Sequence, residues 1–429
     1  MLERIFRLKA NGTNARTEVM AGLTTFMTMA YIIFVNPSIL EAAGLPRVPT
    51  IAATALAAAI PTILMGLYAN YPFALASGMG LNAALAFSVV QGMHLPWQTA
   101  MGIIAVEGII ITILVLTRIR ESIMHAIPMS LKRAIGVGIG ILIAYLGMQQ
   151  AGWVTGNPAT LTGFGSFHKA DTLIATAGLV LILVLMAWRV RAAILIGILA
   201  TAAVAIPLGI GKLPDQWMSM PDFSTFGQLD ILGALKLSLV ATIFAFLITD
   251  FFDTMGTVIG VGGEAGYLSE DGKLPRLGRV LLVDSLAAIW GGICGASSVT
   301  TYVESASGVS VGGRTGLTSV VVGLLFLAAV FFAPAMSIVP AVATAPALII
   351  VGFLLITIVK DIPFENFEES FPAFLMILTI PLTMSISRGI GYGFIAYTII
   401  KLARGKARDI HPLMAAVSII FALSFILEH

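Results

Sequence analysis

The sequence predicts an all-α protein that crosses a membrane many times. Three observations indicate this class: 58% of the 429 residues are hydrophobic, only 11% are charged, and the mean hydropathy is +0.99. A soluble domain carries about 25% charged residues. Apolar stretches also recur along the chain at close to the roughly 20 residues that a helix needs to cross a bilayer. We therefore predict a polytopic membrane protein.

The apolar stretches form two groups of seven, separated by a polar connecting loop at 211–233. The first group covers 17–38, 50–69, 72–91, 98–117, 130–150, 171–188 and 192–210. The second group covers 235–259, 280–296, 298–313, 316–338, 342–359, 371–386 and 388–403. Because seven is an odd number, 1–210 and 234–429 would form two repeats of seven transmembrane segments with inverted orientations, fourteen in all.

The positions of Lys and Arg orient the predicted spans. With a cytoplasmic N-terminus, 19 of the 24 Lys and Arg residues fall on the cytoplasmic side, as the positive-inside rule requires. We therefore expect a multi-pass protein of the cytoplasmic (inner) membrane. Since 401–408 is also placed inside, 371–403 should form two short helices that turn at Ser387–Gly389. The stretch 413–427 then lies along the membrane or packs as a short terminal helix; a single helix at 371–403 would instead make it a span.

The third predicted span of each group is interrupted in the same way. ASGMGLNA (76–83) and SSVTTYVESASG (297–308) both open with small or β-prone residues before they turn helical. The groups also share a motif in their first spans, TTFMTM (24–29) and TDFFDT (249–254). Paired, Gly-interrupted segments at matching positions indicate a transporter's binding site near the membrane midplane. A broken helix also leaves N–H groups and a positive dipole end facing the cavity.

Carboxylates inside these apolar stretches are the main candidates for function. Asp250, Asp253 and Glu304 each sit where a charge costs roughly 2.5–3.5 kcal/mol. Asp253 and Thr257 are four residues apart and share a helix face. Carboxylates suit a ligand rich in N–H donors, and buried ones can exchange a proton near neutral pH. The alternatives are that Asp250 braces a neighbouring helix and that Glu304 caps its own.

Other polar residues are weaker candidates. Asn82 could recognise a heterocycle edge, because its amide both donates and accepts, or it could cap or bridge helices. Gly78 and Gly80 serve backbone geometry before chemistry. For the rest we expect structural or surface roles: a bridge from Glu107 to a Thr or Asn, a solvated or salt-bridged Asp284 near an inner boundary, an exposed Arg388, and Thr24, Thr25 and Thr28 lining the cavity or joining helices. The five His residues fall in loops or ends and suggest no metal site.

Several long motifs, in order, resemble those of a known family. ASGMGLNA, TDFFDTMGT, GGEAGYL and TTYVESASGVSVGGRTGL, together with the opening RTEVMAGLTTFMTMAYIIFVNPSIL, are similar to signatures of the azaguanine-resistance branch of nucleobase–cation symporters. This branch holds the adenine and guanine/hypoxanthine permeases, within the wider xanthine and uracil permease family. The resemblance runs from about residue 16 to residue 427, nearly the whole chain.

The resemblance implies a fold, a substrate site and coupling to protons. It implies fourteen segments, with a core domain from spans 1–4 and 8–11 (about 17–117 and 235–338) and a gate domain from spans 5–7 and 12–14 (about 130–210 and 342–403). Short strands would open the third and tenth spans, with the substrate between them. By motif order the base-binding carboxylates would be Asp253 and Glu304, with Asn82, Thr257 and Gly80 at the site. Thr257 stands where the uracil type carries histidine, which argues against uracil.

Three functions compete on these residues. The first is a proton-coupled importer of purine bases that works by alternating access, with Asp253, Asp250 or Glu304 carrying the proton and no cofactor. The second is an anion transporter on the same scaffold, which acidic residues and the absence of Lys or Arg from both broken spans before Arg314 disfavour. The third, a membrane-embedded enzyme, lacks a His or Cys placed for catalysis. Expected partners are the base and membrane lipids, but no nucleic acid. A second copy bound through the gate domain is an open alternative.

Overall fold

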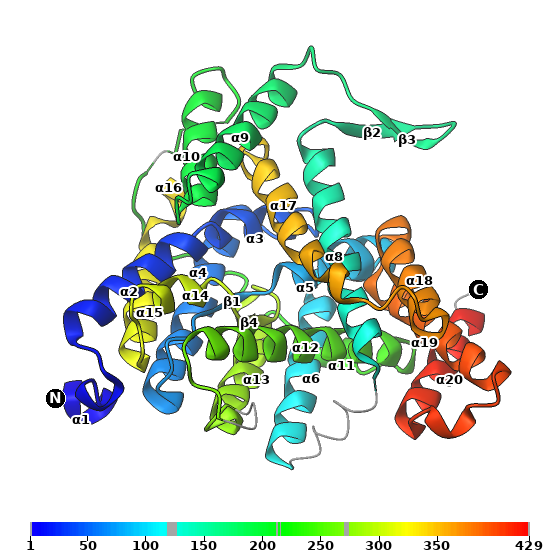
Figure 1. The fold of residues 1–429 in the computed structure, drawn as a ribbon. Helices are drawn as coiled ribbons and strands as arrows, with labels where there is room; N and C mark the ends of the chain where they lie inside the picture. Colours follow the sequence, from blue (N-terminus) through cyan, green and yellow to red (C-terminus); the bar gives the residue numbers. More distant parts are fainter. Residues whose placement is uncertain (1, 118–126, 212, 215, 270–273, 428–429) are drawn as a thin grey trace.

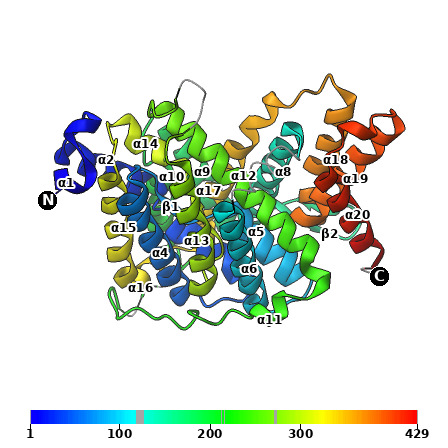
Figure 2. The same cartoon turned by 90° about the horizontal axis from the view of Figure 1, so that it is seen from below.

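The computed structural model describes residues 2–117, 127–211, 213–214, 216–269 and 274–427 (Figure 1). Four cations used for the predicted orientation, Arg118, Arg120, Lys212 and Lys273, lie outside these ranges. Helices dominate the described chain, and the two short strands β1 and β4 lie in its interior (Figures 1 and 2).

Among the described residues, the N-terminal half contains nine α-helices and the central strand β1. Their bounds are α1 (Leu2–Phe6), α2 (Ala15–Met29), α3 (Ile32–Glu41), α4 (Arg47–Leu64), β1 (Leu75–Ser77), α5 (Met79–Ala83), α6 (Trp97–Leu116), α8 (Met129–Gln150), α9 (Ala170–Ala187) and α10 (Ala193–Ala205). A π-helical segment, Ala84–Gly92, continues α5. Asn14 starts α2, because its side chain accepts a hydrogen bond from Thr17 N at 3.0 Å and so caps the helix.

The C-terminal half contains a second central strand, β4, among its helices. Its elements are α11 (Ile231–Ala234), α12 (Val240–Glu264), α13 (Leu277–Cys294), β4 (Val299–Thr301), α14 (Ser305–Ser310), α15 (Gly316–Ala329), α16 (Ala333–Met336), α17 (Ala341–Ile356), α18 (Phe367–Thr383), α19 (Ile386–Ala403) and α20 (Pro412–Leu427).

Nine helices within the described ranges are long and apolar enough to cross a membrane. Three further apolar helices are shorter: Met79–Gly92, Ala193–Ala205 and Pro412–Ile426. Large apolar side chains also face outward, and Trp188, Leu382 and Leu116 are 74%, 73% and 65% exposed. Such a surface is stable against lipid tails but not against water. The chain is therefore a mostly helical integral membrane protein.

The two predicted short strands are present and pair with each other. Strand β1 runs antiparallel to β4, with Leu75 opposite Thr301 and Ser77 opposite Val299. Tyr302 N donates to Ala74 O and Gly78 N donates to Ser298 O, both at 2.9 Å, so the pairing extends one residue beyond each strand. A helix follows each strand, α5 after β1 and α14 after β4. The interrupted motifs thus meet at one place in the interior.

A third and fourth strand were not predicted. Strands β2 (Val154–Asn157) and β3 (Leu161–Phe164) form a hairpin that projects from the end of α8 (Figure 1). Asn157 shapes its turn, because its side-chain oxygen accepts from Ala159 N at 2.8 Å.

Two predicted spans differ from the observed helices. The predicted span 235–259 is helical at Val240–Glu264, because Leu237–Leu239 forms a separate 3-10 turn. The predicted span 298–313 is helical only at Ser305–Ser310, since its β-branched residues Val299–Thr301 form β4. The carboxylates of these two segments therefore sit on a long helix and beside a very short one.

A buried carboxylate missed by the sequence analysis ties α2 to the start of α15. Glu18 is fully buried, and its carboxylate accepts hydrogen bonds from Arg314 N at 2.8 Å and from Thr315 N and Thr318 N at 3.2 Å. These N–H groups belong to the first turn of a helix and its entry, where they have no partners within the helix. Negative charge is also favourable at that end of a helix.

The C-terminal segment 371–403 forms the predicted pair of helices. The chain turns at Met384 and Ser385, between α18 and α19, slightly before the predicted turn. The terminal helix α20 packs on α19, where Ser418 Oγ donates to Phe394 O at 3.1 Å. This packing fits the short terminal helix, one of the arrangements predicted for 413–427.

Three cations on α19 and the loop after it meet one carboxylate at the start of α18. Glu368 is buried and pairs with Lys401 and Lys406 at 2.5 Å and with Arg404 at 2.7 Å. The hydrogen bonds from Lys401, Lys406 and Arg404 lower the pKa of Glu368 to about 2. This cluster fastens the two helices together at the end of the pair that lies away from their turn.

We expect the Glu368→Gln variant to be less stable than the wild type at neutral pH, with a difference that narrows in acid. A lowered pKa stabilises the fold fully above the ordinary glutamate pKa of about 4.3, and this stability is lost as pH falls toward the folded value. Thermal unfolding in detergent at a series of pH values checks this, with exposed Glu365→Gln as the control. If the stability difference between Glu368→Gln and the wild type stayed the same below pH about 4, the ion pairs of Glu368 would not be its cause.

Candidate functional site

A cavity of about 690 Å³ lies between the paired strands and two helices of the predicted gate domain. One wall comes from α5, α12 and the β4–α14 junction, and the opposite wall comes from α8 and α17 with the turn after it. The volume lies within the roughly 300–1,000 Å³ common for small-molecule sites. Polar residues of the core wall include Tyr31, Thr249, Asp253, Thr257, Thr301 and Glu304.

Helix α12 presents Asp253 and Thr257 to this cavity. Both line it, as their spacing of four residues on one helix face predicts. The side chain of Asp253 is exposed to the cavity, and Glu304 lines the same cavity. Asp253 therefore offers its carboxylate oxygens to a molecule that enters the cavity.

The Glu304 side chain reaches the same cavity from the β4–α14 junction. Its side chain makes no N-cap hydrogen bond to the first turn of α14. Instead Glu304 Oε1 accepts a hydrogen bond of 2.5 Å from Tyr31 Oη. A carboxylate has further acceptor sites beyond this one bond. Glu304 is thus held in place and can still accept hydrogen bonds from a ligand.

Gly80 lines the cavity at the point where α5 approaches α8. A Cβ at this position would stand 2.7 Å from Ile139 Cγ2, closer than real carbon contacts. Ile139 is β-branched and has little freedom to move aside. This close approach fits the expectation that Gly80 serves backbone geometry. The absence of a side chain at Gly80 also shapes the cavity at this point.

We expect Gly80→Ala to destabilise this arrangement by about 1–3 kcal/mol, the usual cost of overpacking. In an Ile139→Ala background the Gly80→Ala change should cost less than in the wild type, because the opposing Cγ2 is gone. Gly256→Ala is the matched control, because it lines the same cavity with no atom within 4 Å of the new Cβ. Thermal unfolding of the wild type, the three single variants and the double variant decides: if Gly80→Ala matches Gly256→Ala, the close approach has no energetic weight.

The structure places Asn82 behind the cavity wall. Its side chain is fully buried and donates to Asn36 Oδ1 at 2.6 Å. Asn36 in turn donates to Thr54 Oγ1 and to Ala296 O at 2.9 and 3.2 Å. Asn82 is absent from the residues that line the cavity, and its position matches the interhelical bridge that the sequence left as the alternative. A ligand in the cavity would be separated from the Asn82 side chain by α5 itself.

Behind β4 lies a second set of buried polar groups. Asp284 on α13 is 4% exposed and accepts from Thr301 N, Thr301 Oγ1 and Thr254 Oγ1 at 2.9, 2.8 and 2.6 Å. The expectation that Asp284 is solvated or salt-bridged is therefore wrong: α13 carries it inward, where it anchors the strand. No group of three or more His, Cys, Asp or Glu among the described residues is arranged to hold a metal ion.

Asp250 and Glu107 are also fully buried, and neither lines the cavity. Asp250 accepts from Ser298 Oγ at 3.3 Å, which fits a brace between α12 and the entry to β4. Glu107 on α6 does not bridge to a Thr or Asn as expected. Its carboxyl group lies against that of Asp250.

Three residues at the cavity were not singled out from the sequence. Tyr31 lies between α2 and α3, and Lys132 and Arg133 lie near the start of α8. The ammonium of Lys132 stands 4.3 Å from the centroid of the Phe252 ring, which lines the same cavity. A tyrosine in an apolar stretch and a cation at a span boundary are common features, so the sequence held no signal that set them apart.

The remaining candidates lie elsewhere. Thr24 and Thr28 donate to backbone oxygens of their own helix, Thr25 is buried, and all three are absent from the cavity lining. Arg388 is exposed, as predicted.

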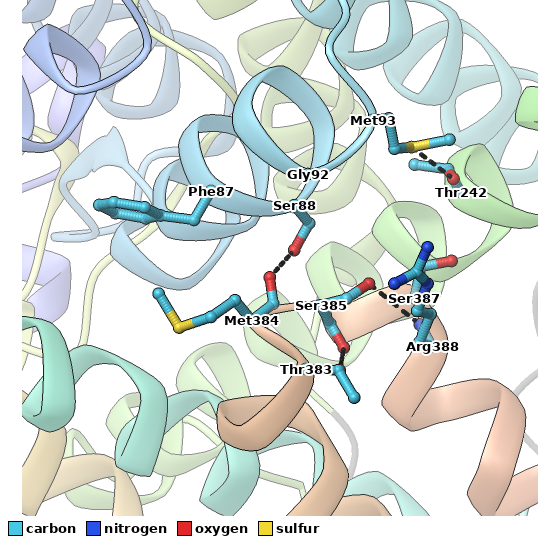
Figure 3. A pocket seen from close by; sticks show the side chains of 10 residues that line it. All are labelled: Phe87, Ser88, Gly92, Met93, Thr242, Thr383, Met384, Ser385, Ser387 and Arg388. Carbon is cyan, nitrogen blue, oxygen red and sulfur yellow. Dashed lines mark hydrogen bonds between the residues drawn. The ribbon is translucent and has the colours of Figure 1, made fainter. Parts of the chain in front are cut away.

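A pocket of about 60 Å³ lies where Ala84–Gly92 meets the turn between α18 and α19 (Figure 3). Ser88 Oγ donates to Met384 O across this contact. Thr242, at the start of α12, reaches the sulfur of Met93 at 3.9 Å. Thr242 precedes the cavity residue Thr249 by seven positions, roughly 10 Å along a helix. Direct contacts thus join these segments here, and the large cavity lies farther along α12.

Comparison with known proteins gives a family and named relatives. The profile of a permease family, Xan_ur_permease, matches residues 16–392. The chain is 43% identical over 427 residues to the adenine permease AdeP of Escherichia coli strain K12, covering 99% of this chain and 96% of AdeP. It is also 43% identical over 438 residues to the guanine/hypoxanthine permease PbuG of Bacillus subtilis strain 168, covering 99% of each chain.

Solved structures show a similar fold at low sequence identity. The transmembrane domain of the cyanobacterial bicarbonate transporter BicA superposes with a TM-score of 0.65 at 13% identity, covering 87% of this chain and 97% of that domain. The structure of SLC26A9 superposes with a TM-score of 0.64 at 10% identity, covering 91% of this chain and 65% of that one. At such identities the likeness concerns the fold alone.

Proposed function

The chain belongs to the Xan_ur_permease family of permeases, and from this membership we propose that it imports purine nucleobases together with protons. Permeases are transporters, so the chain is a membrane transporter and not an enzyme. The proposed substrates are bases of the adenine or guanine/hypoxanthine class, in keeping with the named activities of two relatives that match over 99% of the chain. No cofactor is part of the proposal.

One observation carries the assignment of the site: Asp253 of α12 and Glu304 of the β4–α14 junction line one cavity. Purines present several ring and exocyclic N–H donors along their edges. Two carboxylates supply acceptors for these donors, and a hydrogen bond to a charged group contributes about 1.5–3 kcal/mol. We assign base binding to Asp253 and Glu304, with Thr257 and Gly80 beside them and Asn82 supporting α5 from behind.

The proposed mechanism is alternating access between two units. We propose fourteen spans in two inverted repeats, with a core domain (about 17–117 and 235–338) that carries the site past a gate domain (about 130–210 and 342–403). The antiparallel pairing of β1 with β4 supports inverted repeats, because each strand leads into its helix from the opposite direction. The contact of Ser88 with Met384 O joins the two units on the side away from the cavity, which supports its role as the closed side.

The remaining proposals concern the surroundings of the protein. We place it in the cell membrane with a cytoplasmic N-terminus, in contact with lipids, and we propose a homodimer formed through the gate domain. Asp253, Asp250 and Glu304 are the carboxylates assigned to proton coupling. The cavity would open to the cytoplasm, since exposed residues at its rim, Met129 and Asp361, belong to segments assigned to that side.

Uptake by purified protein in proteoliposomes tests this function. Labelled hypoxanthine and adenine should accumulate when the solution outside the proteoliposomes is more acidic than the lumen, and should not accumulate when the gradient is reversed. Unlabelled purines should compete with the labelled base. Uracil should compete weakly, because Thr257 replaces the histidine expected in the uracil type. Lys132 and Arg133 line the cavity, so bicarbonate and sulfate form a second arm of the assay. Anion uptake without purine uptake would reject the proposal in favour of an anion transporter.

A Ser269→Cys variant tests the orientation. Ser269 lies in the loop between α12 and α13, which the charge bias assigns to the cytoplasm. An impermeant maleimide added to intact cells should leave it unmodified, and permeabilised cells should show rapid labelling. The single native cysteine, Cys294, is buried and gives a low background. Rapid labelling in intact cells would reverse the orientation.

A further inference from the structure

Two fully buried carboxyl groups lie against each other outside the cavity, Glu107 on α6 and Asp250 on α12. Carboxylates this deep are costly unless they are paired or neutralised. The permease mechanism described above uses neither oxygen of Glu107.

The hydrogen-bonding pattern of the pair is incomplete. Neither oxygen of Glu107 receives a hydrogen bond from a hydroxyl, amide or other ordinary donor of the described chain, and the same holds for Asp250 Oδ1. Asp250 Oδ2 accepts only the bond of 3.3 Å from Ser298 Oγ. Buried polar atoms in folded proteins almost always have partners. Three such acceptors in one place favour a state in which one of the two carboxyl groups is protonated and donates to the other.

Within the described part of the chain, no positive charge acts on the pair. The titratable groups that act on it from outside are Asp284 on α13 and Asp253 on α12, both carboxylates. Next to Glu107, Gly108 packs against Ile289 and Ala288 of α13. Two carboxylates in contact cannot both ionise at moderate cost, and such pairs hold one proton between them.

We propose that Glu107 and Asp250 form the site that holds the coupling proton while a base is bound. This inference rests on the proposed purine–proton symport and names a residue, Glu107, that the proposed function leaves unused. Asp253 lies three residues after Asp250, one turn along the same helix, and opens to the cavity. It is the group through which a proton can pass between the pair and water in the cavity.

The pair couples proton and base because both depend on Asp253. While the pair holds its proton, Asp253 can stay ionised and accept an N–H group of the base. When the proton moves, an O–H bond on the pair breaks and an O–H bond on Asp253 forms, which leaves the total charge unchanged. Both carboxyl groups of the pair are then ionised, a costly state that ends when the pair takes up the next proton. Protonated Asp253 has lost acceptor capacity, so the base leaves, and the proton then passes to water in the cavity. Base and proton are therefore carried in the same direction.

Glu107→Gln and Asp250→Asn test this proposal in proteoliposomes. Each amide can donate permanently to the remaining carboxylate, so it replaces the proton without being able to release it. We expect both variants to exchange labelled base across the membrane. We expect them to lose base-driven proton movement, read from an entrapped pH-sensitive dye, and the pH dependence of base binding. Glu264→Gln, an exposed residue at the end of α12, is the matched control and should keep both.

The outcomes separate the possible roles. Proton movement that persists with base transport in both variants would overturn the proposal. Equal loss of base binding, exchange and proton movement in both variants would assign the pair to structural support and would overturn it as well. If the wild type neither binds nor moves a purine, the proposed function fails instead. The proposal predicts that both variants keep base exchange and lose base-driven proton movement.

Discussion

The Asp253→Asn variant is expected to reach the membrane but to lose purine accumulation driven by a pH gradient. Asparagine has the same size, but it cannot bind and release a proton and offers one acceptor oxygen where the carboxylate offers two. Asp253 opens to the cavity, so the change affects the base and the proton path together. We expect at most weak base exchange. Accumulation of labelled hypoxanthine in proteoliposomes, with and without an acidic exterior, is the measurement.

The control for this variant is Asp222→Asn, the same substitution at an exposed residue of the connecting loop. It should accumulate base like the wild type. Full accumulation by Asp253→Asn would exclude Asp253 from both proton coupling and essential base binding. Asp250 and Glu304 would then be the remaining candidates for the proton path on α12 and α14.

The Glu304→Gln variant is expected to bind purines roughly ten- to a hundredfold more weakly. The loss of one charge-assisted hydrogen bond costs about 1.5–3 kcal/mol, which corresponds to this change in Kd. Glutamine keeps the shape of the side chain, and its oxygen can still accept the bond from Tyr31 Oη. The loss therefore reports on contacts to the base and not on a displaced side chain. Equilibrium binding of labelled hypoxanthine to purified protein gives the two Kd values.

Exposed Glu365→Gln provides the matched control and should leave Kd unchanged. A second comparison uses Tyr31→Phe, which removes the hydroxyl that donates to Glu304 but keeps the Glu304 carboxylate. An unchanged Kd in Glu304→Gln together with lost uptake would move Glu304 from base binding to proton coupling.

The strongest sequence signals were those that conflict with a plain transmembrane helix. β-branched residues at Val299–Thr301 fit a strand better than a helix, and the segment is a strand. Leu75–Ser77, also a strand, was marked only by the glycines that follow it. Asp253 and Thr257 share a helix face by spacing alone, and that face lines the cavity. Local chemistry therefore predicted which segments are unusual.

Depth and direction of side chains were harder to predict. Asp284 lies near the predicted end of a span, yet α13 turns it toward β4, where backbone and hydroxyl donors satisfy it. Asn82 follows the glycines of the same motif as Gly80 but points to Asn36, behind the wall. The contact between Glu107 and Asp250 joins residues 143 positions apart, which no local pattern encodes. These features depend on how helices pack, which spacing within one segment does not contain.

The location of a bound purine tests the central claim most directly. A cryo-EM structure of the purified protein with hypoxanthine is expected to show the base in the cavity between α12 and the β4–α14 junction. Its N–H edges should lie within hydrogen-bonding distance of Asp253 and Glu304, at about 2.7–3.2 Å. A base bound outside this cavity, or one that contacts neither carboxylate, would contradict the account.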